Sequence, residues 1–336
     1  MSWARAWARN LHAIAWRDRA ISRLQAEREM LGSPHSDVPS FYRHAYADRR
    51  IFQHMRRHLD VDDDPADLFG RKLMGYSFAQ SHGVRIPVLY GLWDEPEDIA
   101  WHELPDEAVV KPLSGHHSLG VFPMRRRSGE WTIVTKTDPT SPAEVVDQLR
   151  RLTRERKISG PYFAEELYGG GEGNAIPTEI RVFTFYGEVG LVNIRTSSDH
   201  GNIDGVAVSR FLEDGTPGPV HPLHDDSITP PAIFDELVAV AKRLSLAIPR
   251  PFVRVDLYAL DDAIGFGEFT RRPGGSQDLG TTTDRRLGEL WEKAEARLVS
   301  DLMAGASFGL SYGPGRRELM FGDRAYLPLR GWVESS

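Results

Sequence analysis

Two carboxylates stand where strand residues are usually apolar. Asp256 lies in the apolar run 252–258 and Glu268 in the run 264–269, and the two runs predict strands joined by a tight turn. Facing side chains of neighbouring antiparallel strands lie about 5 Å apart, so both carboxylates can point to one face of a sheet. Two carboxylates at that distance repel unless a cation lies between them, and Mg²⁺ is the hard ion that oxygen ligands share with substrate phosphates. A salt-bridged sheet face would give the same pattern.

Three arginines flank these carboxylates. Arg254 precedes Asp256 by two residues, and Arg271 and Arg272 follow Glu268 closely. Arginines would oppose a bare cation, but they suit a site filled by phosphate because a guanidinium binds phosphate oxygens in pairs. The combination therefore favours a site for a metal together with a phosphorylated substrate.

A lysine at the end of an apolar strand is a second candidate for phosphate binding. Lys111 closes the strand predicted at 108–112, and the small-residue loop 113–120 follows it. Such a lysine supplies a point charge, and the loop supplies free backbone N–H groups. The order of a Walker A loop is absent, and an ordinary glycine-containing hairpin would look similar.

Two acidic segments are candidates for contacts with a nucleoside. The strand predicted at 161–167 has two glutamates near its end, before the glycine-rich stretch 169–173. This pattern is typical of a hinge, and the backbone of such a hinge could bind a nucleobase. Glu179 opens the strand predicted at 179–185 and could accept hydrogen bonds from ribose hydroxyls. A surface salt bridge explains this glutamate as simply.

The remaining pattern predicts the elements that position these residues. Helices are expected at 69–81, 141–156, 231–245 and 287–304, and further strands at 84–88, 121–124, 131–134 and 188–195. Ser141 or Thr140 is the expected N-cap of the second of these helices, with Glu144 near capping-box spacing. The strands at 179–185 and 188–195 are expected to form a hairpin around Tyr186 and Gly187.

The first 60 residues predict arginine-rich helix. Trp3, Trp7, Leu11 and Ile14 recur at helical spacing. This stripe is more typical of a helix that docks on the rest of the protein than of one that lies on an anionic membrane surface.

Composition limits the function classes. The 336 residues are 40% apolar and 26% charged, with a net charge of −7, so no basic field indicates nucleic acid as a partner. Cysteine is absent, which excludes disulfides, thiol nucleophiles and cysteine-ligated zinc. No run approaches 18 apolar residues, and no apolar signal segment opens the chain, so a cytoplasmic protein is expected.

The order of these segments resembles the ATP-grasp superfamily, most closely its TupA-like branch, named after teichuronic acid biosynthesis. The resemblance covers about residues 70–290 and includes an Arg-Val-Asp-Leu-Tyr strand followed by Gly-Glu-x-Thr. It implies an α+β, ATP-grasp fold, in which two α/β lobes grip ATP, preceded by a helical N-terminal segment. The implied divisions are a helical segment (1–68), a linker helix and strand (69–105), a small lobe (106–168) and a large lobe with the metal site (169–336).

The resemblance also implies roles for individual residues. The positions that match the family's ATP-binding residues are Lys72, Lys111, Ser114, Gly115, Ser118, Gly120, Glu165, Glu166, Leu167, Glu179 and Arg181. The implied Mg²⁺ ligands are Asp256, Glu268 and Thr270, and Arg254 matches the arginine that steadies the transferred phosphoryl group. Arg271 and Arg272, which adjoin the carboxylates, are further candidates for catalysis. Thr270 stands where asparagine is common in the superfamily, and a threonine is expected there in the TupA-like branch.

The function implied is that of an ATP- and Mg²⁺-dependent ligase that joins a carboxylate to an amine through an acylphosphate. The acid and the amine would be small molecules or a glycan, in cell-surface glycan, small-peptide or natural-product biosynthesis. Two alternatives remain open: a kinase of the same fold, and a non-catalytic nucleotide-binding scaffold of a glycan pathway. The N-terminal helix leaves peripheral contact with the inner membrane face as a further expectation.

Overall fold

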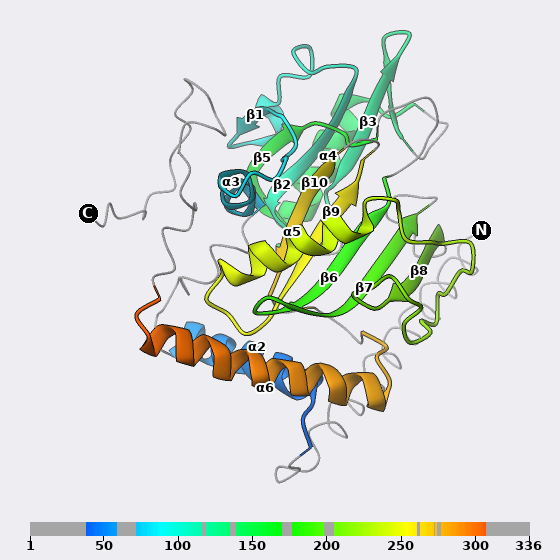
Figure 1. Cartoon of the computed structure of the whole chain (residues 1–336). Coiled ribbons are helices and arrows are strands. Elements are labelled where there is room, and N and C mark those ends of the chain that lie inside the picture. The colour runs from blue at the N-terminus through cyan, green and yellow to red at the C-terminus, as the bar shows by residue number, and fades with distance from the viewer. Residues whose placement is uncertain are drawn as a thin grey trace, which may run out of the picture. The chain divides into compact units, whose positions relative to one another are not determined.

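The computed structural model describes residues 38–58, 72–115, 119–134, 139–169, 177–197, 205–260, 263–271, 273 and 277–306. The chain divides into two compact units, one of residues 1–60 and 272–293 and the other of residues 61–271 and 294–336. Both β-sheets belong to the second unit (Figure 1). Among the described residues, no helix combines the length and the apolar character needed to cross a membrane.

The first sheet has five antiparallel strands in the order β1–β5–β2–β3–β4. Its strands are β1 (Leu89–Trp93), β2 (Glu107–Ser114), β3 (Phe122–Arg127), β4 (Glu130–Ile133) and β5 (Ser159–Glu165), and a short 3₁₀ helix, η2 (Pro96–Asp98), follows β1. The helix α4 (Pro142–Arg154) covers one face, where Val145 and Leu149 share a buried cluster with Val110 and Ala164. Because side chains alternate along a strand, Lys111 points to the other face.

The second sheet has the order β10–β9–β6–β7–β8 and is also antiparallel. Its strands are β6 (Glu179–Phe185), β7 (Glu188–Ser197), β8 (Val206–Phe211), β9 (Val253–Ala259) and β10 (Ile264–Thr270). One face is apolar and packs against α5 (Phe234–Leu246) and α3 (Lys72–Ser81) in a single buried cluster (Figure 1). The opposite face carries the polar residues of β9 and β10. The sheet therefore has the apolar core on one face and the candidate site residues on the other.

Most predicted elements are present, and the α+β class is confirmed. Ser141 caps α4 by accepting a hydrogen bond from the Glu144 backbone N–H, and the Glu144 carboxylate bonds back to Ser141, which completes the predicted capping box. The predicted hairpin of β6 and β7 around Tyr186 and Gly187 is also present.

One strand prediction is wrong, and one strand was not predicted. Residues 84–88 do not form a strand: Arg85 makes only an isolated bridge to Gly265, and Pro87 has no N–H to donate, so the strand β1 starts at Leu89. The strand β8 was not predicted because its pattern is polar at buried positions. Ser209 is 1% exposed and donates its hydroxyl to the carbonyl of Asp225 at 2.7 Å, a partner that local sequence does not reveal.

The first unit contains α2 (Phe41–His58) and the start of α6 (Thr281–Met303), which begins six residues before the helix predicted there. The His44 ring stacks on Trp291 with ring centroids 5.3 Å apart, and the Tyr42 backbone N–H donates to Asp284 at 2.9 Å. A Cβ added at Gly288 would lie 2.3 Å from the Ser40 backbone nitrogen, so only glycine permits this approach of the helix to the chain before α2. The tryptophan stripe predicted at residues 3–14 lies outside the described residues.

Candidate active site

The carboxylates of Asp256 and Glu268 come from directly paired positions of β9 and β10. A β-bulge at Gly267 produces this pairing, since Phe266 pairs with Leu257 and one extra residue separates it from Glu268. A Cβ added at Gly267 would lie 2.9 Å from the Asp256 carbonyl oxygen, so the bulge requires glycine. The predicted placement of both carboxylates on one face is therefore confirmed. Their role as metal ligands stays a prediction.

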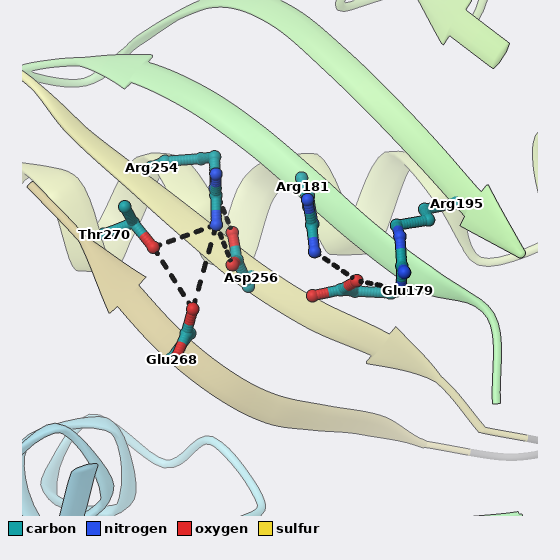
Figure 2. Close-up of polar contacts among 7 residues, drawn as sticks. All are labelled: Glu179, Arg181, Arg195, Arg254, Asp256, Glu268 and Thr270. Atoms are coloured by element: carbon teal, nitrogen blue, oxygen red, sulfur yellow. Dashed lines mark hydrogen bonds and ion pairs between the residues drawn. The ribbon is translucent and has the colours of Figure 1, made fainter. Parts of the chain in front are cut away.

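Arg254 holds Asp256 by two parallel hydrogen bonds, from Nε to Oδ1 at 2.7 Å and from Nη2 to Oδ2 at 2.5 Å (Figure 2). Nη2 also donates to the Thr270 hydroxyl at 2.9 Å, which donates in turn to Glu268 Oε1 at 3.3 Å. Burial raises the pKa of Asp256 to about 6, and Arg254 opposes that rise, so the carboxylate is ionised at neutral pH. Asp256 is 1% exposed, whereas the Glu268 side chain is 50% exposed.

This donor set fits a hard divalent cation that is shared with a substrate. Among the described residues, no group of three or more His, Cys, Asp or Glu side chains could hold a metal on its own. Mg²⁺ in phosphate-transfer sites uses one or two carboxylates and takes its other ligands from phosphates and water. Asp256 still has lone pairs beyond the two that Arg254 occupies, and the Glu268 carboxylate is half exposed. The two carboxylates therefore suit a magnesium ion that arrives with a nucleotide.

The polar face continues onto β6 and β7. Arg181 lies opposite Asp256 in the next strand and donates from Nη2 to Glu179 at 2.8 Å, while Arg195 of β7 approaches the same Glu179 oxygen at 3.3 Å (Figure 2). Burial acts to raise the pKa of Glu179, but Arg181, Arg195 and Arg254 outweigh it and the pKa is lowered. Glu179 was predicted to contact the ribose. Its carboxylate is already held by two arginines, and the predicted contact stays a prediction.

Lys111 lies on the face of the first sheet that α3 covers. Its ammonium forms an ion pair with Glu165 and donates to the Tyr76 hydroxyl at 2.9 Å. Lys72, at the start of α3, donates from Nζ to the Pro112 carbonyl at 3.0 Å. Burial first, and then the charge of Lys111, lower the pKa of Lys72 to about 8, while Glu268 and Glu165 act in the opposite direction. Lys72 therefore lies within electrostatic range of Lys111, Glu165 and Glu268.

The predicted hinge begins where β5 ends at Glu165. The next residue, Glu166, pairs with Arg85 at 2.5 Å and donates its backbone N–H to the Val88 carbonyl at 2.8 Å. Leu167 follows and is half-buried. The Glu165 carboxylate forms an ion pair with Lys111 and accepts a hydrogen bond from Tyr76. A nucleobase contact in this segment would therefore use the backbone.

The remaining predicted site residues that the structure describes lie at or after the ends of β2 and β10. Ser114 ends β2, Gly115 follows it, and Gly120 closes the loop with φ +74°, a conformation that favours glycine. Arg271 follows β10, while Ser118 and Arg272 lie outside the described residues.

Sequence reasoning missed Tyr76 and Arg195. The signal for Tyr76 was its position four residues after Lys72 on a helix, which places both side chains on one face. Arg195 gave no local signal, since its relation to Glu179 depends on strand register.

Comparison with solved structures finds ATP-grasp enzymes, each of low identity. The chain is similar to the ATP-grasp ligase PsnB complexed with a phosphomimetic variant of a minimal precursor, Mg and ADP (14% identity, TM-score 0.38, 70% of this chain and 60% of that chain). It is also similar to a RiPP-associated ATP-grasp ligase of Chryseobacterium gregarium in complex with ADP and a leader and core peptide (12%, 0.37, 66% and 58%). A third is a D-alanine–D-alanine ligase from Bacillus anthracis (17%, 0.45, 70% and 70%). The chain thus spans about three fifths of the length of the first two.

No protein of curated function matches the chain. The sequence profile of the TupA-like ATP-grasp family matches residues 53–292, which is more than half of the 336 residues. The two-sheet α+β architecture agrees with the fold that the sequence resemblance implied. The chain therefore belongs to the TupA-like ATP-grasp family.

Proposed function

We propose that this protein is an ATP- and Mg²⁺-dependent ligase that joins a carboxylate to an amine through an acylphosphate. The observation that carries the proposal is the paired placement of Asp256 and Glu268 beside Arg254 on the polar face of the second sheet. Family membership supports ATP as the co-substrate. We propose an amino acid, an amino sugar or a glycan amine as the acceptor.

The chain's residues would act by neutralising and orienting charge. Lys72 and Lys111 would face the nucleotide phosphates as point charges, and bound Mg²⁺ would supply further charge neutralisation at Asp256 and Glu268. Arg254 uses Nε and Nη2 to bind Asp256 and Thr270, and its Nη1 donors have no partner among the described residues. Those donors are available to the phosphoryl group that is transferred.

The reaction would have two steps. A carboxylate oxygen of the acid attacks the γ-phosphorus, the bond to the β,γ-bridging oxygen breaks, and ADP leaves with that electron pair. The amine nitrogen then attacks the acyl carbon, the carbon–oxygen bond to phosphate breaks, and the amine proton passes to solvent. Positioning and charge stabilisation drive such a transfer, so the protein needs no nucleophile of its own.

A screen of amino acids and amines for ATP-dependent phosphate release tests the proposal. Phosphate release is expected only when both an acid and an amine are present with Mg²⁺, and mass spectrometry should find the amide. The matched control is Glu268→Gln, which keeps the side-chain shape and removes the negative charge of a proposed ligand. A product that retains the phosphoryl group would identify a kinase instead, and wild-type protein that binds no MgATP would overturn the proposal.

A further inference from the structure

The helix α3 contacts the end of β2 through two side chains. Lys72 and Tyr76 are four residues apart and therefore share one face of the helix. Lys72 Nζ donates to the carbonyls of Pro112 at 3.0 Å and Leu113 at 3.5 Å, and the Tyr76 hydroxyl bonds to Lys111. One face of α3 thus forms hydrogen bonds to Lys111, Pro112 and Leu113, where β2 leads into the predicted phosphate loop.

The Tyr76 hydroxyl is the centre of a directed hydrogen-bond chain. Lys111 Nζ donates to it at 2.9 Å, and it donates to Glu165 Oε2 at 2.7 Å. The direction is fixed because an ammonium only donates and a carboxylate only accepts. Burial first, and then Glu165, raise the pKa of Tyr76 well above its ordinary value of 10, so the hydroxyl keeps its proton.

These contacts restrict the Lys111 ammonium to one orientation. The Tyr76 oxygen and the Glu165 carboxylate engage two of its three N–H groups. Nζ also lies 5.5 Å from the centroid of the Tyr76 ring and 5.3 Å from that of Phe163. The lysine side chain is 13% exposed, which leaves part of it accessible to a ligand.

We propose that Tyr76 is a positioning residue for the nucleotide phosphates, acting through Lys111. The proposal rests on the proposed function, since it needs ATP as the ligand. The Tyr76 ring also meets Phe266 edge-on, with centroids 6.0 Å apart. Phe266 belongs to β10, the strand of Glu268, so one side chain contacts both the phosphate lysine and the strand of the metal carboxylate.

The test is isothermal titration of Tyr76→Phe with MgATP and, separately, with adenosine. The matched control is Tyr162→Phe, because Tyr162 is also buried and loses one hydrogen bond, to Thr153 at 2.6 Å, within the cluster on the opposite face of the first sheet. We expect Y76F to weaken MgATP binding about tenfold, as loss of a hydrogen bond to a charged group would, and to leave adenosine binding unchanged. Y162F should change neither affinity. Phenylalanine keeps the ring and its packing, and cooperative thermal melting of both variants checks their folding.

A double-mutant cycle with Lys111→Met shows whether Tyr76 acts through the lysine. The loss caused by Y76F should disappear in the K111M background, because the group it positions is gone. The assignment is overturned if Y76F binds MgATP as wild type does, if adenosine binding falls equally, or if the loss persists in K111M. Wild-type protein that fails to bind MgATP would overturn the proposed function, and this assignment with it.

Discussion

Replacing Lys72 with methionine should stabilise the fold while it weakens MgATP binding. Burial and the neighbouring Lys111 lower the pKa of Lys72 from 10.5 to about 8. At about 1.36 kcal/mol per pKa unit, the charged lysine costs the folded state about 3.4 kcal/mol at pH 7. The variant loses the hydrogen bond to the Pro112 carbonyl, worth about 1 kcal/mol. The net expectation is that K72M unfolds with a free energy about 2 kcal/mol higher than wild type at pH 7.

The pH dependence gives the sign of the effect. Between pH 8 and pH 10.5 the unfolded chain keeps the Lys72 proton and the folded chain releases it, so wild-type stability rises with pH in that window. At pH 9.5 the wild type should have regained about 2 kcal/mol, which removes the advantage of K72M. Titrations of groups that do not interact with Lys72 cancel in the difference between the two proteins.

The assay is urea unfolding followed by circular dichroism at pH 7 and pH 9.5. Lys157→Met is the control, because that lysine is 54% exposed and pairs with Glu155 on the surface. Its unfolding free energy should stay within about 0.5 kcal/mol of wild type at both pH values. A K72M protein less stable than wild type at pH 7, or a difference that does not change with pH, would refute the reasoning.

Three further predictions concern the site itself. Glu268→Gln should abolish Mg²⁺-dependent turnover. Because this side chain is 50% exposed, the variant should change the unfolding free energy by less than about 1 kcal/mol. A large loss of stability in urea would contradict this prediction. Arg254→Lys keeps the charge but loses the bidentate pair of hydrogen bonds to Asp256, so single-turnover phosphoryl transfer should slow at least about tenfold. An unchanged rate would exclude a role for Arg254 in phosphoryl transfer. MgATP affinity should fall as pH rises through 8 while Lys72 loses its proton, and calorimetry of K72M should show no such fall.

Local patterns in the sequence predicted much of the fold. Alternation along β9 placed Arg254 and Asp256 on the face opposite Val253 and Val255, because side chains alternate in any strand. The capping box at Ser141 was equally readable, since its two partners are three residues apart. The ordered motifs then indicated the family, although each of them was weak alone.

The site depended on contacts between residues that are distant in sequence. Strict alternation from Phe266, which pairs with Leu257, would have opposed Glu268 to Val255 on the apolar face. The bulge at Gly267 moves Glu268 to the side of Asp256, and only the close approach of β9 to that glycine reveals the bulge.

The partners of Tyr76 show the same limit. Its hydroxyl joins Lys111, which is 35 residues away, to Glu165, which is 89 residues away. The sequence by itself determined which residues could do chemistry and, along the regular strand β9, which face they occupy, because periodicity is a local property. The tertiary structure alone decided which of them meet, because register, bulges and helix packing are set by the burial of the whole core.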